Sequence, residues 1–264
     1  MSNLLCTESV TGETRALVDQ QMCTSQKVFD NLLKLEMRYV PRMNPINSAQ
    51  RTITSEHRRV CTSWMLEITE ECKFENSVFP LAVSLMDRFL CLGPLSRAHF
   101  QLTACTSLFI AAKLRSVHLF PRGIFEYHTD FAVTSSQIVS WEALMTIKLG
   151  WDLASVSAND IVDHIYLRLP ALHRLPHGDV ICAHAHVLAH LAITDASNIT
   201  EKPSVIATAA ILGALRGLCV NTITAESLCQ ITRANKIVVE NLATLNEKLL
   251  ANYMMSSHRF DSFN

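Results

Sequence analysis

Glycine is scarce in this sequence: only 7 of its 264 residues are glycine, whereas 49% are apolar. Tight hairpin turns and the glycine-rich loops that hold phosphates need more glycine than this, which argues against a turn-rich β fold. No P-loop, dinucleotide-binding glycine pattern or HExxH stands out, and no nucleophile is arranged with a base. The composition therefore predicts an all-α protein, and no motif supports an enzyme or a cofactor.

An excess of charge of one sign is also lacking. The formal net charge is −1 and charged residues make up 18% of the chain, so no basic field attracts nucleic acid or an anionic membrane. The uncharged helical stretch of residues 100–112 is shorter than the roughly 20 apolar residues that span a bilayer, and it contains several polar residues. We therefore expect protein partners, with no nucleic acid and no membrane.

Paired cysteines are missing as well. The nine cysteines are odd in number and form no CxxC pair, which is not the pattern of a disulfide framework. The N-terminus lacks the basic and long apolar regions of a secretory signal. These features favour a reducing compartment, and we expect the protein in the nucleus and the cytoplasm.

A short histidine cluster invites a metal interpretation. His184, His186 and His190 follow Cys182, and His186 and His190 lie four residues apart on one helical face. Structural zinc sites usually need two pairs of ligands at short spacings, and no second pair is visible. The sequence therefore predicts no metal site.

Apolar residues recur at helical spacing through most of the chain, and the helices fall into two sets. One helix, from Ser25 to Pro41, precedes five helices between about 53 and 150. Five more are expected near 157–169, 178–194, 203–218, 224–231 and 235–253. The third helix of each set is uncharged and rich in small residues, as expected for a rod surrounded by other helices.

This correspondence predicts an internal duplication and an all-α fold of two tandem five-helix domains with an N-terminal helix. We expect residues 1–24 to form a flexible arm and residues 25–152 to form the first domain with its preceding helix. Residues 153–264 then form the second domain.

Three constellations are candidates for function, each with a structural alternative. Lys113 and Glu142, if both point outward at one place, offer a partner a positive and a negative anchor; alternatively, they are a lysine that ends a helix and a solvated glutamate. Arg58 and Asp87 lie on apolar helical faces, which predicts a buried ion pair.

The third constellation is a shallow apolar groove between two helices with a charged rim, for which ordinary core packing is the alternative. Its residues are Val60, Cys61, Trp64, Met65, Phe100 and Gln101, with Glu67 and Arg97 at the rim.

The N-terminal arm contains an L-x-C-x-E pattern, formed by Leu4, Cys6 and Glu8. A flexible segment of this kind can become ordered on a receptor groove.

Five segments together resemble the D-type cyclins, and the resemblance covers nearly the whole chain. They read VFDNLLKLEMRYVPR, RRVCTSWMLEITEE, VFPLAVSLMDRFL, LTACTSLFIAAKLR and WEALMTIKLGWDLASVSANDIV. The resemblance implies two cyclin boxes, the first of which binds a cyclin-dependent kinase. The chain ends without the proline-rich, Thr-Pro-containing tail expected of cellular D-type cyclins; a herpesviral member of the group would explain this, and so would a truncated form of a cellular one.

The resemblance also implies roles for individual residues. Lys113, Glu142, Leu114 and Trp151 correspond to the kinase-binding surface. A groove that receives Arg-x-Leu peptides of substrates and inhibitors corresponds to His57, Val60, Cys61, Trp64, Glu67, Arg97, Phe100 and Gln101, with Arg58 and Asp87 buried beneath it. His57 replaces the usual methionine of that groove, and Cys61 replaces a larger aliphatic residue. Leu4, Cys6 and Glu8 match the motif that binds retinoblastoma-type pocket proteins.

We therefore expect a non-catalytic regulatory subunit that activates a cyclin-dependent kinase of the D-type-partner class and promotes cell-cycle entry. Expected partners are this kinase, retinoblastoma-type pocket proteins as its substrates, and kinase-inhibitor proteins. The alternative is a cyclin-box adaptor that binds pocket proteins or transcription factors without activating any kinase.

Overall fold

The computed structural model describes residues 19–118, 120–173 and 178–261, and these residues form helices and no strand, as predicted. The helices that precede and form the first domain are α1 Gln20–Thr24, α2 Gln26–Tyr39, α3 Pro45–Ser48, α4 Ser55–Glu71, α5 Val78–Leu90, α6 Phe100–Arg115, α7 Arg122–His128 and α8 Ser135–Lys148. Those that follow are α9 Ala158–Arg168, α10 Pro170–His173, α11 Gly178–Thr194, α12 Pro203–Gly217, α13 Ala225–Thr232 and α14 Lys236–Asp261. Two 3₁₀ turns, η1 Arg97–His99 and η2 Ala196–Asn198, precede α6 and α12.

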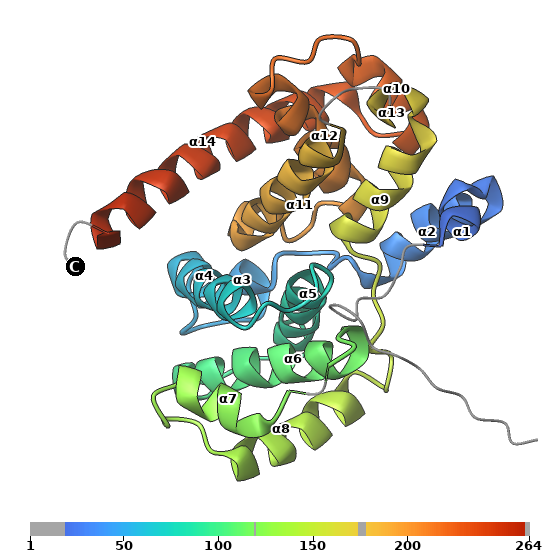
Figure 1. Ribbon diagram of the computed structural model, residues 1–264. Helices are drawn as coiled ribbons and strands as arrows, with labels where there is room; N and C mark the ends of the chain where they lie inside the picture. The colour runs from blue at the N-terminus through green and yellow to red at the C-terminus, as the bar shows by residue number, and fades with distance from the viewer. Residues whose placement is uncertain (1–18, 119, 174–177, 262–264) are drawn as a thin grey trace, which may run out of the picture.

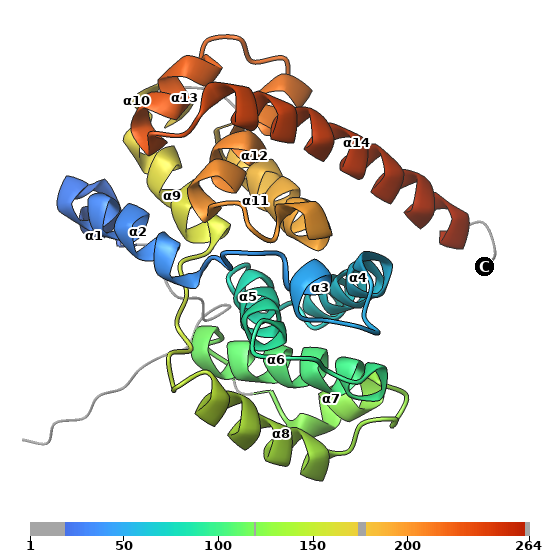
Figure 2. The ribbon, with the colours of Figure 1, turned by 180° about the vertical axis from the view of Figure 1, so that it is seen from behind.

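The first domain is built around α6. Every residue from Leu102 to Ala112 is buried, because α4, α5, α7 and α8 all pack against this helix. In both ribbon views, α4 and α5 lie on the side of α6 that faces the second domain, and α7 and α8 lie on the far side (Figures 1 and 2). The predicted set of five helices around an uncharged rod is confirmed.

The second domain repeats this arrangement around α12, as the sequence predicted. Residues Ser204 to Leu215 are all buried, and α9, α11, α13 and α14 surround the helix. The small residues allow close approach: a Cβ added to Gly213 would lie 3.1 Å from Leu188 Cδ1 of α11. A short helix, α10, is added between α9 and α11.

Helix α2 packs against the second domain, although the sequence analysis grouped it with the first. Phe29 is fully buried in the hydrophobic cluster of the second domain. The carboxylate of Glu36 accepts hydrogen bonds from the backbone N–H and the hydroxyl of Ser204, both at 2.8 Å. Glu36 thus satisfies one backbone N–H group, that of Ser204, at the beginning of α12, where a helix favours negative charge.

The expectation that residues 1–24 form a flexible arm needs a correction, because residues 20–24 are helix α1. Asp19 caps this helix by accepting hydrogen bonds from the N–H groups of Gln21 and Met22. The guanidinium of Arg168 in α9 donates a hydrogen bond to the carbonyl of Cys23 in this helix. A contact between residues so far apart in the chain leaves no local pattern in the sequence. Residues 1–18 lie outside the described ranges.

Polar contacts tie the two domains together along the layer of α4 and α5. The Arg58 side chain donates hydrogen bonds to the carbonyls of Ile193 and Thr194 at the end of α11, both at 3.0 Å. His190 of α11 and Asn159 of α9 meet at the carbonyl of Asn76, which precedes α5. The two domains therefore have a defined orientation relative to each other.

The C-terminal part of α14 extends from the second domain towards α4 (Figures 1 and 2). Leu249, Leu250 and Tyr253 of this helix pack against the hydrophobic cluster of the first domain. The Tyr253 hydroxyl donates a hydrogen bond of 3.2 Å to Glu70 at the end of α4. This helix is therefore a second bridge between the domains.

Two expectations from composition also concern the described residues. The eight cysteines among them are all free. No helix in the described ranges combines the length and the apolar character needed to cross a membrane.

Candidate functional site

Lys113 and Glu142 meet on the surface of the first domain. Lys113 lies in the last turn of α6, where positive charge is favoured, and its Nζ is 2.5 Å from Glu142 Oε1 of α8. The Lys113 ammonium also lies over the ring of Phe109, 5.2 Å from the centroid. The lysine side chain is 49% exposed and the glutamate side chain 21%. The two charges therefore occupy one accessible place, as the sequence analysis required of a pair of anchors.

Exposed apolar side chains lie at the C-terminal ends of α6 and α8, the two helices that carry these charges. Leu114 follows Lys113 and is half-exposed, and Ile147 lies in the last turn of α8 and is 65% exposed. Trp151, just beyond that turn, is 73% exposed. Several large apolar residues exposed at the ends of two adjacent helices are typical of a protein interface rather than of an ordinary surface. Ile147 was not identified from the sequence, because its helical period alone does not separate it from core positions.

The end of α8 explains why Trp151 is exposed. The N–H of Gly150 bonds to the carbonyl of Ile147, and the N–H of Trp151 bonds to that of Thr146, which is the Schellman arrangement. Gly150 has a φ of 64°, as this motif requires, and Trp151 also has a positive φ of 59°. A tryptophan in the left-handed region costs about 1 kcal/mol or more. The chain therefore holds this side chain in solvent at a cost in stability.

Arg115 fixes the other side of this surface. It is the last residue of α6, and its guanidinium donates to the Ser155 carbonyl at 3.1 Å and to Asp160 at 3.3 Å. Asp160 is also the partner of Ser157 in the capping box that begins α9. The segment that carries Trp151 is therefore anchored to α6 at one end and to α9 at the other.

The residues predicted to form the docking groove lie on α4, η1 and α6, and α4 packs against α6. Cys61 and Phe100 are buried in the first hydrophobic cluster, and burial raises the pKa of the Cys61 thiol to about 12. Cys61 and Phe100 can therefore line the bottom of the predicted groove. The Cys61 thiol stays protonated at neutral pH, so it is not a reactive nucleophile. Val60 is exposed on α4, and the indole of Trp64 is partly buried and donates to the carbonyl of His128.

The charged rim of this groove is exposed. Glu67, Arg97 and Gln101 all lie at the surface. Partial burial, followed by the charge of Glu70, raises the pKa of Glu67. His57 is partly buried, and its Nδ1 accepts a hydrogen bond from the N–H of Thr54 in the capping box that begins α4. His57, which stands where a methionine was expected, therefore helps to cap the N-terminus of α4.

The predicted ion pair between Arg58 and Asp87 is present. The Arg58 guanidinium makes two parallel hydrogen bonds to the Asp87 carboxylate, at 2.8 and 2.7 Å, and its side chain is 1% exposed. This bidentate geometry is the strongest form of such a pair. Its remaining donors reach the second domain, so the pair lies beneath α4 and also at the domain boundary.

A basic hollow that reaches Lys148 and Leu149 at the end of α8 was not identified from the sequence. It has a volume of about 370 Å³ and lies at the ends of α2, α5 and α8, with four cationic side chains from Arg38, Arg42, Arg88 and Lys148 in its lining. Arg88 Nη1 is buried and has no hydrogen-bond partner among the described residues. These cations are separated by up to 110 residues in the chain, so no local charge run indicates them.

Leu4, Cys6 and Glu8 lie outside the described residues, and the structure gives no geometry for the L-x-C-x-E pattern.

Comparisons with known proteins agree with this architecture. Residues 27–154 match the family model of the cyclin N-terminal domain, and residues 169–261 match that of the cyclin C-terminal domain. Human G1/S-specific cyclin-D3 is 36% identical over 86% of this chain and 77% of its own length. Rat G1/S-specific cyclin-D2 is 33% identical over 97% of this chain and 90% of its own length.

Among solved structures, a viral cyclin from herpesvirus saimiri has the same fold. Its TM-score is 0.75 at 20% sequence identity, and the match covers 85% of this chain and 96% of the viral protein. The two family models, the two D-type relatives and this shared fold lead to one conclusion. The chain belongs to the cyclin family, as a relative of the G1/S-specific D-type cyclins.

Proposed function

We propose that the surface around Lys113 and Glu142 is the one through which this chain binds and activates a cyclin-dependent kinase. As a cyclin, the chain is a regulatory subunit of a kinase and not itself an enzyme. The observation that carries the proposal is the exposed, strained Trp151 just beyond the end of α8, the helix that also supplies Glu142 to the accessible ion pair. A partner that covers the indole removes apolar surface from water, which favours binding.

The energetics of this surface favour association. Burying a tryptophan and neighbouring aliphatic side chains supplies much of the binding free energy in many interfaces. About half of the Lys113 side chain and a fifth of the Glu142 side chain are exposed, and ion pairs in contact with solvent contribute little to stability. Each side chain can therefore turn to an oppositely charged group of the kinase at small cost. Arg42 and Lys148 in the basic hollow favour an acidic kinase segment there, whereas Arg38 already pairs with Asp152 at 2.7 Å.

Activation follows from differential binding. In a protein kinase, the ion pair between a β-strand lysine and a C-helix glutamate must form before phosphoryl transfer. A rigid apolar surface that fits the C-helix only in its inward position binds the active state more tightly, so it raises the population of that state. The chain needs no catalytic residue of its own for this effect.

The charge swap Lys113→Glu with Glu142→Lys tests the surface. It preserves an ion pair within the chain, so the fold is expected to survive, but it presents both charges with the wrong sign to the kinase. We expect at least about tenfold weaker binding to a purified kinase of the D-type-partner class, measured by calorimetry. The matched control is the swap Arg216→Glu with Glu247→Arg, since that pair is similarly exposed in the second domain.

Unchanged kinase binding by the folded Lys113/Glu142 variant would contradict the assignment of these residues. An equal loss in the control variant would do so too, because it would show a non-specific effect of charge swapping. A parallel assay measures phosphorylation of a retinoblastoma-protein fragment with and without the chain. Co-purification with the kinase but no rise in phosphorylation would favour the adaptor alternative.

We further propose two substrate contacts. The groove between α4 and α6 receives Arg-x-Leu peptides, with the arginine near the exposed carboxylate of Glu67. Leu4, Cys6 and Glu8 engage retinoblastoma-type pocket proteins. The variant Cys6→Gly should therefore raise the KM for a pocket-protein substrate several-fold and leave the KM for a short peptide substrate unchanged. Equal KM values for both substrates in the variant and the parent would refute this role.

A further inference from the structure

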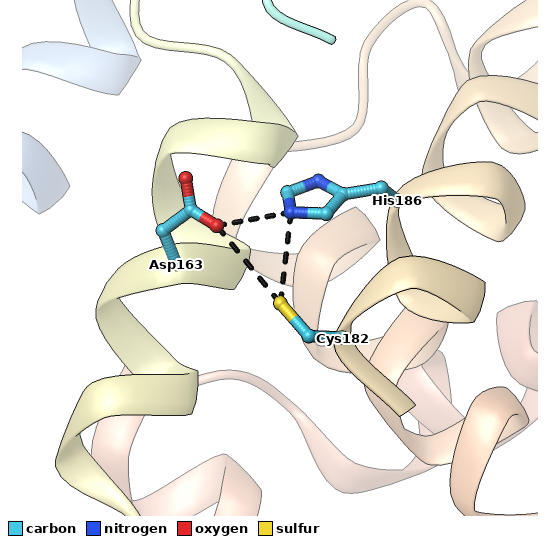
Figure 3. Close-up of side chains that lie close together, drawn as sticks. All are labelled: Asp163, Cys182 and His186. Atoms are coloured by element: carbon cyan, nitrogen blue, oxygen red, sulfur yellow. Dashed lines mark hydrogen bonds and ion pairs between the residues drawn. The ribbon is translucent and has the colours of Figure 1, made fainter. Parts of the chain in front are cut away.

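Three metal-ligating side chains meet in the second domain, away from the proposed kinase surface. Asp163 extends from α9, and Cys182 and His186 extend from α11 (Figure 3). His186 Nε2 lies 2.9 Å from Asp163 Oδ1, and Cys182 Sγ lies 3.7 Å from the same nitrogen and 4.0 Å from the same oxygen. The sequence analysis considered Cys182 and the histidines and found no further ligand.

Helix geometry brings these three groups together. Cys182 and His186 are four residues apart, so they lie on successive turns of one face of α11. Asp163 faces them because α9 packs against α11. His190, the other histidine with this spacing, is instead bound to the carbonyl of Asn76. The ligand missing from the sequence pattern is therefore a carboxylate on a neighbouring helix.

The distances fit a small tetrahedral ion. With typical zinc bond lengths and tetrahedral angles, a nitrogen and an oxygen ligand lie about 3.4 Å apart, and sulfur lies about 3.6 Å from each. The distances between the three atoms differ from these values by about 0.5 Å or less. Small side-chain rotations would correct them. We propose that Asp163, Cys182 and His186 form a zinc-binding site.

The charges and the exposure of the cluster suit this ion. A thiolate and a carboxylate neutralise the two positive charges of Zn²⁺, which lowers the cost of holding the ion in a half-buried place. The Cys182 thiol gives up its proton to solvent when the metal binds. The Asp163 side chain is 35% exposed and that of His186 11%, so one side of the cluster is open to solvent. A water molecule can complete the coordination there.

Mixed sulfur, nitrogen and oxygen ligands favour zinc over calcium or magnesium, which prefer oxygen alone. His186 Nδ1 is buried and has no hydrogen-bond partner in the described ranges, so Nε2 is the nitrogen that faces the cluster. The metal would link α9 to α11 directly. Arg168 of α9 donates a hydrogen bond to the Cys23 carbonyl of α1. A metal that fixes α9 to α11 would therefore also stabilise the packing of α1 against α9.

Cobalt(II) is the probe for the test, since a cobalt–thiolate bond gives a near-ultraviolet charge-transfer band. Metal-free full-length protein should bind one cobalt ion with this band, and zinc should displace it. The band should vanish in Cys182→Ser, and affinity should fall at least about tenfold in Asp163→Asn and His186→Gln. His184→Gln and Cys219→Ser are matched controls, because both residues are exposed and lie outside the cluster.

The absence of the band in the parent protein would overturn the proposal, as would a band that survives Cys182→Ser. Equal losses in the two controls would also overturn it. Circular dichroism of each variant separates loss of metal from loss of fold, and Asp163→Asn keeps the shape of the side chain should the other variants unfold. In the parent protein, zinc should also raise the Tm, as it binds only the folded chain. This inference does not depend on kinase binding.

Discussion

Replacing Arg58 by methionine is expected to weaken both the first domain and its attachment to the second. Arg58 is 1% exposed, and its guanidinium makes four hydrogen bonds, two to Asp87 and one each to the carbonyls of Ile193 and Thr194. Methionine has a similar length but no donors. The substitution Arg58→Met leaves the Asp87 carboxylate buried without its counter-charge, and it leaves two carbonyls at the end of α11 without these donors.

The magnitude follows from these losses. Removing one partner of a buried ion pair typically costs about 3–5 kcal/mol. For a chain of this size, each kcal/mol lowers the Tm by roughly 2–4 °C, so Arg58→Met should lower it by on the order of 10 °C. The double variant Arg58→Met with Asp87→Leu should recover part of the loss, since no buried charge remains. Recovery should stay incomplete, because an unsatisfied carbonyl costs about 1–3 kcal/mol.

Thermal unfolding followed by circular dichroism measures these effects. Arg59→Met is the matched control: this neighbour is exposed and pairs only with Glu56 on its own helix, so its Tm should not change measurably. A Tm for Arg58→Met within 2 °C of the parent would refute the reasoning. A double variant no more stable than the single one would show that the carbonyls of α11, and not the charge of Asp87, dominate.

Three further results are expected. Burial lowers the pKa of His190 to about 4 from 6.5, so the unfolded chain binds more protons between these values and stability falls as the pH falls through this window. At pH 5 the loss should be roughly 1–2 kcal/mol by denaturant titration, and it should disappear in His190→Gln. Val60→Asp should weaken binding of a labelled Arg-x-Leu peptide at least about fivefold by fluorescence polarisation, whereas Val187→Asp, equally placed on an exposed face of α11, should not. Glu36→Ala should lower the Tm more than Glu36→Gln, because glutamine keeps one acceptor for the beginning of α12; equal Tm values would contradict this capping role.

Long helices were predictable from the sequence because their pattern is local. The stretches around α6 and α12 are uncharged and rich in small residues, and only burial on all sides makes such a composition favourable. Caps such as Thr134 and Ser157 mark helix beginnings through hydrogen bonds within three residues. The two-domain arrangement followed from the repetition of this pattern.

Short helices and distant partners were not predictable, because tertiary contacts determine them. Helix α1 has five residues, and a helix of this length has little stability of its own. The position of α2 depends on Glu36 meeting Ser204, which lies 168 residues away. Asp163 resembles any other acidic residue of an amphipathic helix until α11 packs beside it. The pairing of Arg58 with Asp87 was inferable only because both charges interrupt apolar faces.

The layered fold keeps the proposed sites apart while it couples one of them to the domain boundary. The zinc cluster lies between α9 and α11, the groove lies on α4 and α6, and Lys113 meets Glu142 where α6 packs against α8 (Figure 1). Arg115 breaks this separation, because it joins the end of α6 to Ser155 and Asp160 at the beginning of the second domain. Loosening that contact would disturb the segment that presents Trp151. The second domain can thus influence kinase binding through the placement of that segment, without any contact with the kinase.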